Sequence, residues 1–140
     1  MKTTNENRIE RALQTAIDRT MERVRHDPKI TKMIIQQRIR DMSDQEIIEK
    51  FIYDYEDIQT NTYKDAIGRA FEKTGTPSKA GTLLSTAMFF RWADTTYGNG
   101  YLNEEEFQTA KEQVKLTARI LARYIDTRPL REYELNKLEN

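Results

Sequence analysis

The stretch that organises the chain is residues 89–110, FFRWADTTYGNGYLNEEEFQTA. It holds the only tryptophan and two of the five glycines among 140 residues, and two helical patterns meet within it. The Gly-Asn-Gly triplet at 98–100 favours a tight turn between those helices. Asn103 followed by Glu106 is a capping box that begins the second helix. Four aromatic residues around the turn are predicted to lie in the core: Phe89, Phe90, Trp92 and Phe107.

On both sides of this stretch, apolar residues recur at intervals of three and four, the period of amphipathic helices. Capping boxes at Thr3 with Glu6 and Ser43 with Glu46, and Pro28 and Pro77 at first helical positions, mark helix starts. The predicted helices cover about residues 3–26, 28–42, 43–58, 63–71, 78–93 and 103–126, with Gly75 ending the fourth. The last residues, about 128–140, form either a short helix or a loosely docked tail.

These patterns predict an all-α protein, a compact orthogonal bundle of six or seven helices forming one domain over residues 1–140. The helix at about 78–93 is apolar on nearly every side, so it is predicted to be the central hydrophobic helix. We find no internal repeat and no linker long enough to divide the domain.

Composition excludes several classes of protein. Lys and Arg together number 23, as do Asp and Glu, so no net charge draws the whole chain to nucleic acid or to an anionic membrane. The absence of cysteine rules out disulfides, thiol catalysis and thiolate zinc sites. No signal peptide or membrane-spanning run is present in the sequence. We therefore expect a soluble, cytoplasmic protein without a membrane partner.

The residues after the turn follow the order found in the second half of a calcium-binding loop. Gly100 stands at the midway glycine, Leu102 at the apolar position two residues later, and Glu106 at the bidentate carboxylate. Residues 89–110 therefore resemble an EF-hand, and this resemblance implies calcium, held by Asp94, Asn99, Tyr101, Asn103 and Glu106.

The first half of the loop departs from the EF-hand pattern, because Thr95 and Tyr97 stand where the family has carboxylate or amide ligands. An insertion around Gly98 would bring the carboxylate of Asp94 within reach of the calcium ion. The alternatives are a metal-free, EF-hand-like helical corner and an ordinary turn followed by a capped helix. No cofactor other than calcium is indicated.

Catalytic constellations are missing from the sequence. His26 is the only histidine, which excludes a serine triad with a spare histidine and two-histidine metal sites, and its position suits a partner of the helix C-terminal dipole. There is no phosphate-binding glycine loop and no nucleophile elbow. We expect no catalytic residues and no enzymatic activity.

Charge is unevenly distributed along the chain. Residues 1–40 hold ten Lys or Arg against five Asp or Glu, whereas residues 41–57 hold seven acids and one lysine. On the last long predicted helix, four cations recur every four residues and form a basic ridge: Lys111, Lys115, Arg119 and Arg123. Four arginines of the first predicted helix add to this ridge if the first and last long helices lie side by side: Arg8, Arg11, Arg19 and Arg23. Such a ridge can bind a phosphate backbone. The basic and acidic segments can equally pair within one chain or across a homodimer.

The function expected from the sequence is binding to another protein, as a regulator or inhibitor. Seven tyrosines and many arginines favour protein interfaces. The composition suits a bacterial or phage accessory protein. Nucleic-acid binding through the basic ridge is the alternative, and weak calcium binding is the third hypothesis.

Overall fold

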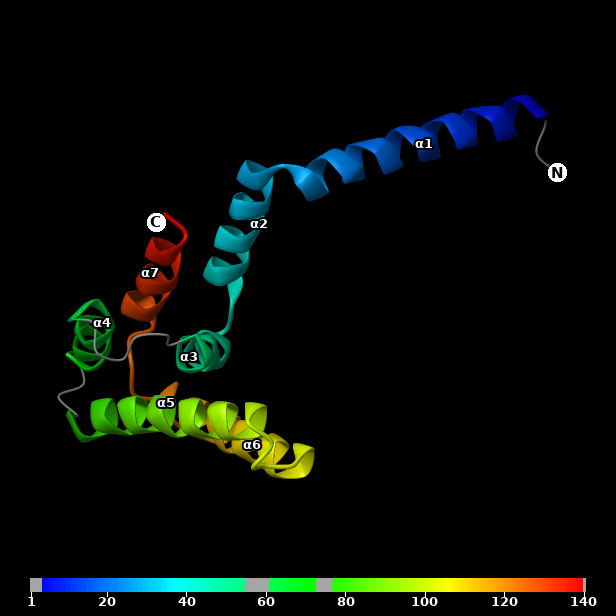
Figure 1. Ribbon diagram of the computed structural model, residues 1–140. Coiled ribbons are helices and arrows are strands. Elements are labelled where there is room, and N and C mark those ends of the chain that lie inside the picture. The colour runs from blue at the N-terminus through cyan, green and yellow to red at the C-terminus, as the bar shows by residue number, and fades with distance from the viewer. Residues whose placement is uncertain (1–3, 55–60, 73–76, 140) are drawn as a thin grey trace. The chain divides into compact units, whose positions relative to one another are not determined.

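The computed structural model describes residues 4–54, 61–72 and 77–139. Within these residues all regular structure is helical (Figure 1). The helices are α1 (Thr4–His26), α2 (Pro28–Asp41), α3 (Asp44–Tyr53), α4 (Asn61–Phe71), α5 (Pro77–Gly98), α6 (Glu104–Leu121) and α7 (Arg128–Lys137). The prediction of an all-α fold with six or seven helices is confirmed.

Contacts divide the chain into two units, Met1–Arg38 and Ile39–Asn140, and the boundary falls inside α2. The first unit contains α1 and most of α2. Asp27 begins α2, since its carboxylate accepts hydrogen bonds from the backbone amides of Lys29 (2.9 Å) and Ile30 (3.4 Å). The predicted cap at Thr3 lies outside the described residues. The single domain predicted over residues 1–140 stays a prediction.

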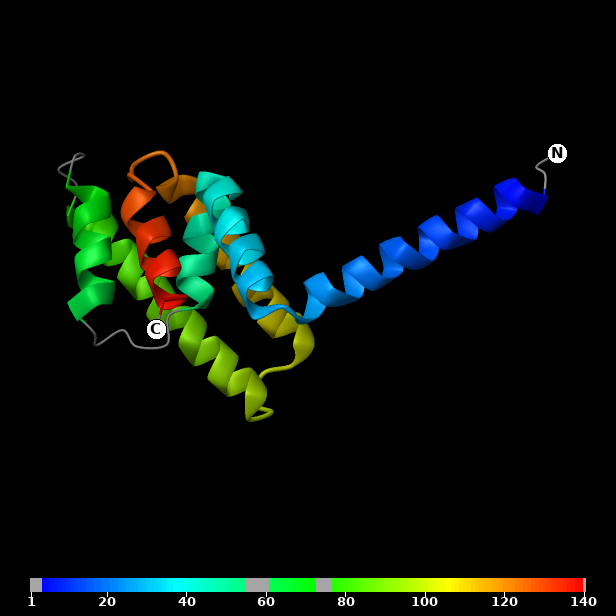
Figure 2. The same cartoon turned by 90° about the horizontal axis from the view of Figure 1, so that it is seen from above.

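The second unit is a helical bundle in two layers. In Figure 1, α3 and α4 are seen nearly end-on, whereas α5 and α6 run side by side across them. Figure 2 shows α7 between α3 and α4, which it contacts. This crossing is the orthogonal arrangement that the sequence predicts. Residues 128–137 form α7 rather than a loose tail, because Leu130 is completely buried.

The core of the bundle is built from the apolar stripes that helical periodicity predicts from the sequence. Ile47, Ile48, Phe51 and Ile52 of α3 are all completely buried. Phe51 stacks on Tyr63 of α4 at 4.4 Å between ring centroids, and Tyr133 of α7 meets both rings edge-on. The predicted stripe continues to Ile58, and the predicted cap at Gly75 follows α4, but both residues lie outside the described ranges.

Helix α5 differs from the sequence prediction in two ways. It extends to Gly98 instead of ending near Ala93, because nothing between those residues breaks a helix. It contacts α3, α4 and α6, as expected of a central helix, yet one face stays open. Phe90 and Phe107 lie in the core as predicted, whereas the core positions predicted for Phe89 and Trp92 are wrong, since these side chains are 37% and 57% exposed.

Candidate interaction surfaces

The first surface is the apolar stripe of α1, which we define as Ile9, Leu13, Ile17 and Met21. No side chain of α1 is buried, and these four are 45–68% exposed. The opposite face is polar, with Gln14 donating to Asp18 at 2.8 Å. Arginines and His26 occupy the last turn, where they complement the helix dipole. Within its own unit, α1 is thus an amphipathic helix whose apolar side packs against nothing.

The residues of the predicted basic ridge belong to two units. Lys111 and Lys115 lie on α6 beside a groove of about 550 Å³ between α3, α5 and α6. Arg119 lies one turn further, and Arg123 lies just beyond the end of α6. The other four predicted residues, Arg8, Arg11, Arg19 and Arg23, lie on α1 in the first unit. The eight residues therefore form two sets of four, one in each unit.

Acidic side chains share the groove with the two lysines. Glu49, Asp94 and Glu112 line it together with the lysines. Burial and the nearby charge of Glu49 raise the pKa of Tyr53, whose ring packs edge-on against Phe90. This mixture of charges weakens a phosphate-binding surface at Lys111 and Lys115. Nucleic-acid binding through the ridge stays a prediction.

The predicted calcium ligands lie on a helix end, a short turn and a helix start. Residues 94–98 belong to α5, and Asp94 lines the groove described above. Gly100 has φ +81°, a conformation that favours glycine, and the Tyr101 amide donates to the Thr96 carbonyl at 2.9 Å. Asn99 and exposed Tyr101 flank this turn.

Asn103 and Glu106 are the two predicted ligands that directly contact each other. Each side chain accepts a hydrogen bond from the other residue's backbone amide, at 2.8 and 3.0 Å, so the predicted capping box is confirmed. Across the described residues, no group of three or more His, Asp or Glu residues is placed to hold a metal ion. Calcium binding stays a prediction.

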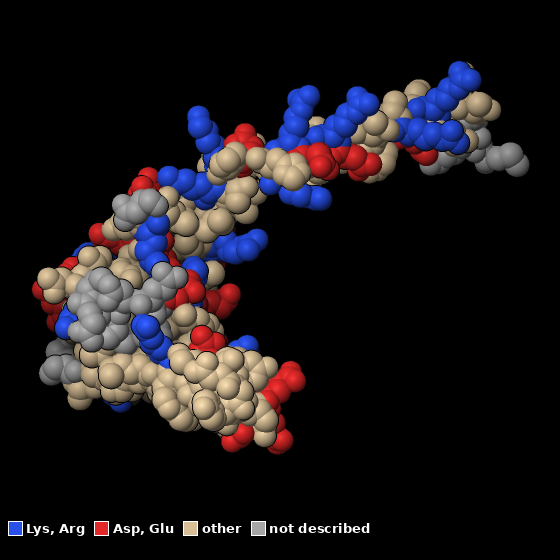
Figure 3. All heavy atoms as spheres, in the orientation of Figure 1, with Lys and Arg blue, Asp and Glu red and all other residues tan. Residues whose placement is uncertain are grey.

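The second surface lies on the outside of α5 and α6. A shallow groove of about 500 Å³ runs between the two helices, and none of its lining residues is charged: Ser78, Gly81, Thr82, Ser85, Thr86, Phe89, Gln113 and Thr117. Large apolar side chains surround it, including Trp92, Leu116 and Ile120. Figure 3 shows a broad uncharged area over α5. We call this surface the α5–α6 face.

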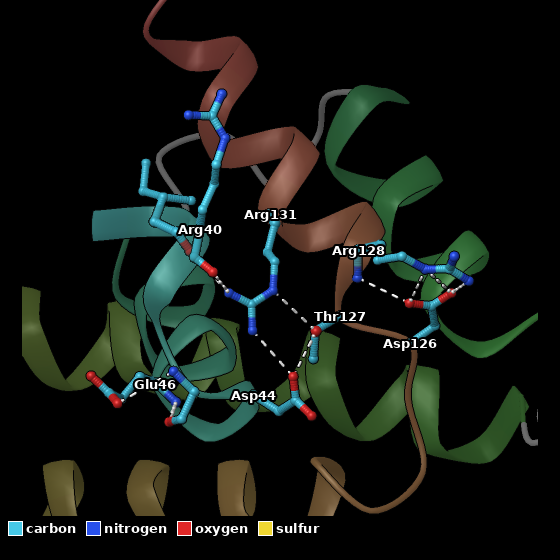
Figure 4. A network of polar contacts seen from close by, with 9 residues as sticks. Arg40, Asp44, Glu46, Asp126, Thr127, Arg128 and Arg131 are labelled. Carbon is cyan, nitrogen blue, oxygen red and sulfur yellow. Dashed lines mark hydrogen bonds and ion pairs between the residues drawn. The ribbon is translucent and has the colours of Figure 1, made fainter. Parts of the chain in front are cut away.

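A polar cluster that sequence reasoning missed joins α7 to α2 and α3 (Figure 4). The Arg131 guanidinium donates to the carbonyls of Ile39 (2.9 Å) and Arg40 (3.2 Å) and to the carboxylate of Asp44 (3.1 Å). Thr127 donates to the same carboxylate at 2.9 Å. Arg131 thus satisfies carbonyls at the C-terminal end of α2. Its partners are about 90 residues away in sequence, so no local pattern signals the contact.

Glu134 is a buried acid in the same bundle and was also missed. Its side chain is 3% exposed, and its Oε2 lies 3.7 Å from the ammonium groups of both Lys50 and Lys137. Burial raises the pKa of Glu134 to about 7, although the two lysines oppose this shift. The contact with Lys50 links α7 to α3, while the other oxygen, Oε1, is buried without a hydrogen-bond partner among the described residues.

No described helix combines the length and the apolar content needed to cross a membrane. Comparisons with family models, curated proteins and solved structures give no match.

Proposed function

We propose that the protein acts by binding another protein, as a regulator or inhibitor, and that α1 is the segment that binds. The observation that supports this is a 23-residue amphipathic helix that buries no side chain in its own unit. Helices in water draw most of their stability from packing of the apolar face, and α1 lacks that packing. A partner that covers the stripe supplies it.

The stripe supplies part of the energy that binding needs. Burying a large apolar side chain contributes roughly 1.5–3 kcal/mol, and the four stripe residues are about half exposed or more. Covering them therefore contributes on the order of 3–7 kcal/mol, against an association cost of about 4–15 kcal/mol. The stripe thus provides the anchors of a helix in an apolar groove, at Ile9, Leu13 and Ile17, and contacts beside the stripe have to add the remaining energy.

The charges beside the stripe indicate the chemistry of the partner. At about 100° per residue, Arg8, Arg19 and Arg23 fall within a sector of roughly 60° along one edge of α1. Arginine side chains at the rim of an interface favour carboxylates on the other protein. The partner we propose is a protein with an apolar groove that has acidic residues along one side.

Photo-crosslinking in the cells that produce the protein tests this proposal. A photoreactive amino acid replaces Leu13 on the stripe or, as the matched control, Asp18 on the polar face of α1. We expect Leu13 to crosslink to one protein and Asp18 not to do so. Crosslinks from Leu13 only to the protein's own chain, or equal products from both positions, would contradict the proposal.

A binding measurement with the captured protein completes the test. Leu13→Glu places a charge in the apolar contact and should weaken binding by at least about tenfold, whereas Asp18→Lys should change it little. Circular dichroism of the full chain checks that both variants keep their helices. Equal affinities for the two variants would show that the stripe is not the binding surface.

A further inference from the structure

We propose that the α5–α6 face is the interface of a homodimer, covered by the same face of a second copy in antiparallel orientation. This surface is separate from α1 and does not depend on the function proposed above. Six large side chains on or beside it stay exposed by 37–57%: Met88, Phe89, Trp92, Leu116, Ile120 and Tyr124. In a chain in which a third of residues are charged, a groove with no charged lining residue beside exposed large apolar side chains indicates an interface. The nearby cation is Lys79, whose ammonium lies 4.9 Å from the centroid of the Tyr124 ring.

Two hydroxyls of the groove already have hydrogen-bond acceptors within α5. The hydroxyls of Thr82 and Thr86 donate to carbonyls of their own helix, those of Ser78 (3.1 Å) and Thr82 (2.7 Å). These donors are already satisfied, so covering them leaves neither hydroxyl proton without an acceptor. Gly81 has no side-chain neighbour within 4 Å of the position that a Cβ would take, so the floor of the groove is open to an incoming side chain.

The exposed apolar side chains supply more than half of the area that a dimer needs. Taking roughly 200 Å² for each large side chain, the six exposed fractions sum to on the order of 500 Å². A standard interface buries about 800 Å² on each partner. The small and hydroxyl residues of the groove have to supply the remainder, which two antiparallel helices per copy can do by forming a four-helix layer.

The order of acidic and basic residues along α6 favours a second copy of the chain as the protein that covers this face. Thr109, Gln113, Leu116 and Ile120 recur at intervals of four, three and four, as in a helix-packing stripe. Glu105, Glu112 and Arg119 are spaced by seven residues and are all exposed. Glu112 also lines the groove that holds Lys111 and Lys115, so this charged edge lies between that groove and the stripe.

Acids thus precede the base along one edge of the helix. A twofold axis near Leu116 places Glu112 of each copy opposite Arg119 of the other, so the face is complementary to itself. A parallel arrangement would put like charges together.

Sedimentation velocity of the full chain at increasing concentration tests the proposal. We expect the mass to rise from 16.6 kDa toward twice that value. Leu116→Glu should return it to the monomer with helix content unchanged, whereas Tyr101→Glu, at an 80% exposed turn position, should remain dimeric. A wild-type monomer at 100 μM, or a dimer that survives Leu116→Glu and is lost in Leu13→Glu, would overturn it.

A charge exchange tests the orientation independently of folding. Glu112→Arg and Arg119→Glu should each weaken the dimer severalfold, and the double variant should recover it because the opposed pairs are restored with reversed signs. If the two single variants have the wild-type dissociation constant, or if the double variant is no tighter than the singles, the antiparallel arrangement is wrong.

Discussion

Replacing Glu134 by glutamine tests how the bundle holds α7, and its effect should depend on pH in a defined direction. The pKa of Glu134 is raised from 4.5 to about 7 by burial. An acid whose folded-state pKa lies above its unfolded value binds its proton more tightly in the folded state. Stability from this group is therefore present at low pH and is lost as pH rises from about 4.5 to about 7.

The size of the effect follows from the two pKa values. Each unit of difference corresponds to about 1.4 kcal/mol, so the full loss is on the order of 3 kcal/mol, of which about 2.5 kcal/mol falls between pH 5 and pH 8. The amide that Glu134→Gln introduces is neutral throughout this range, so the variant lacks this loss. Lys50, Lys137 and Asp54 contribute the other nearby charges in both proteins.

Urea unfolding of both proteins at pH 5 and pH 8 measures the effect. The difference in unfolding free energy, variant minus wild type, should increase by about 2–3 kcal/mol from pH 5 to pH 8, and groups common to both proteins cancel. Glu132→Gln, on the exposed face of α7, is the matched control and should show no such increase. A difference that is the same at both pH values, or one that decreases, would refute the reasoning.

Three further outcomes are expected. Arg131→Met should cost about 1 kcal/mol in urea unfolding, because it removes the donor to the part-buried carbonyl of Ile39 and the ion pair with exposed Asp44, and equal stability to wild type would contradict the role of this cluster. Glu106→Gln keeps the capping box but removes the carboxylate, so a calcium-dependent rise in melting temperature that this variant loses would establish the metal site, and wild-type melting unaffected by millimolar calcium would exclude it. Nucleic-acid binding through the basic ridge predicts a mobility shift of DNA at low salt that weakens in Lys115→Glu with Arg119→Glu, and an unchanged shift would remove the ridge from consideration.

Local features of the fold could be predicted from the sequence. The caps at Ser43 and Asn103 form as expected, since a capping box involves residues only three apart. The buried stripe of α3, which includes Phe51, follows from helical periodicity in the same way. These signals involve residues within one or two helical turns, so they do not depend on how the rest of the chain folds.

Features set by distant residues could not be predicted. The residues Phe89 and Trp92 are as apolar as Phe90, and only the packing of α3 and α6 against α5 decides which of the three is covered. The hydrogen bonds of Arg131 likewise depend on where α2 ends relative to α7. For the candidate surfaces, the sequence indicated the amphipathic α1 but not that its stripe is unpacked within its own unit, because periodicity shows an apolar side without showing its neighbour.

Amide hydrogen exchange on the free full chain gives the most direct test of whether the apolar stripe of α1 is unpacked until a partner binds. Because its stripe is unpacked, amides around Leu13 and Ile17 should exchange far faster than those around Val114 and Leu121, which are buried in α6. Adding the crosslinked partner protein should slow exchange in α1. Protection of α1 in the free monomer equal to that of α6 would show that the stripe is already covered within the chain, and it would contradict binding through α1.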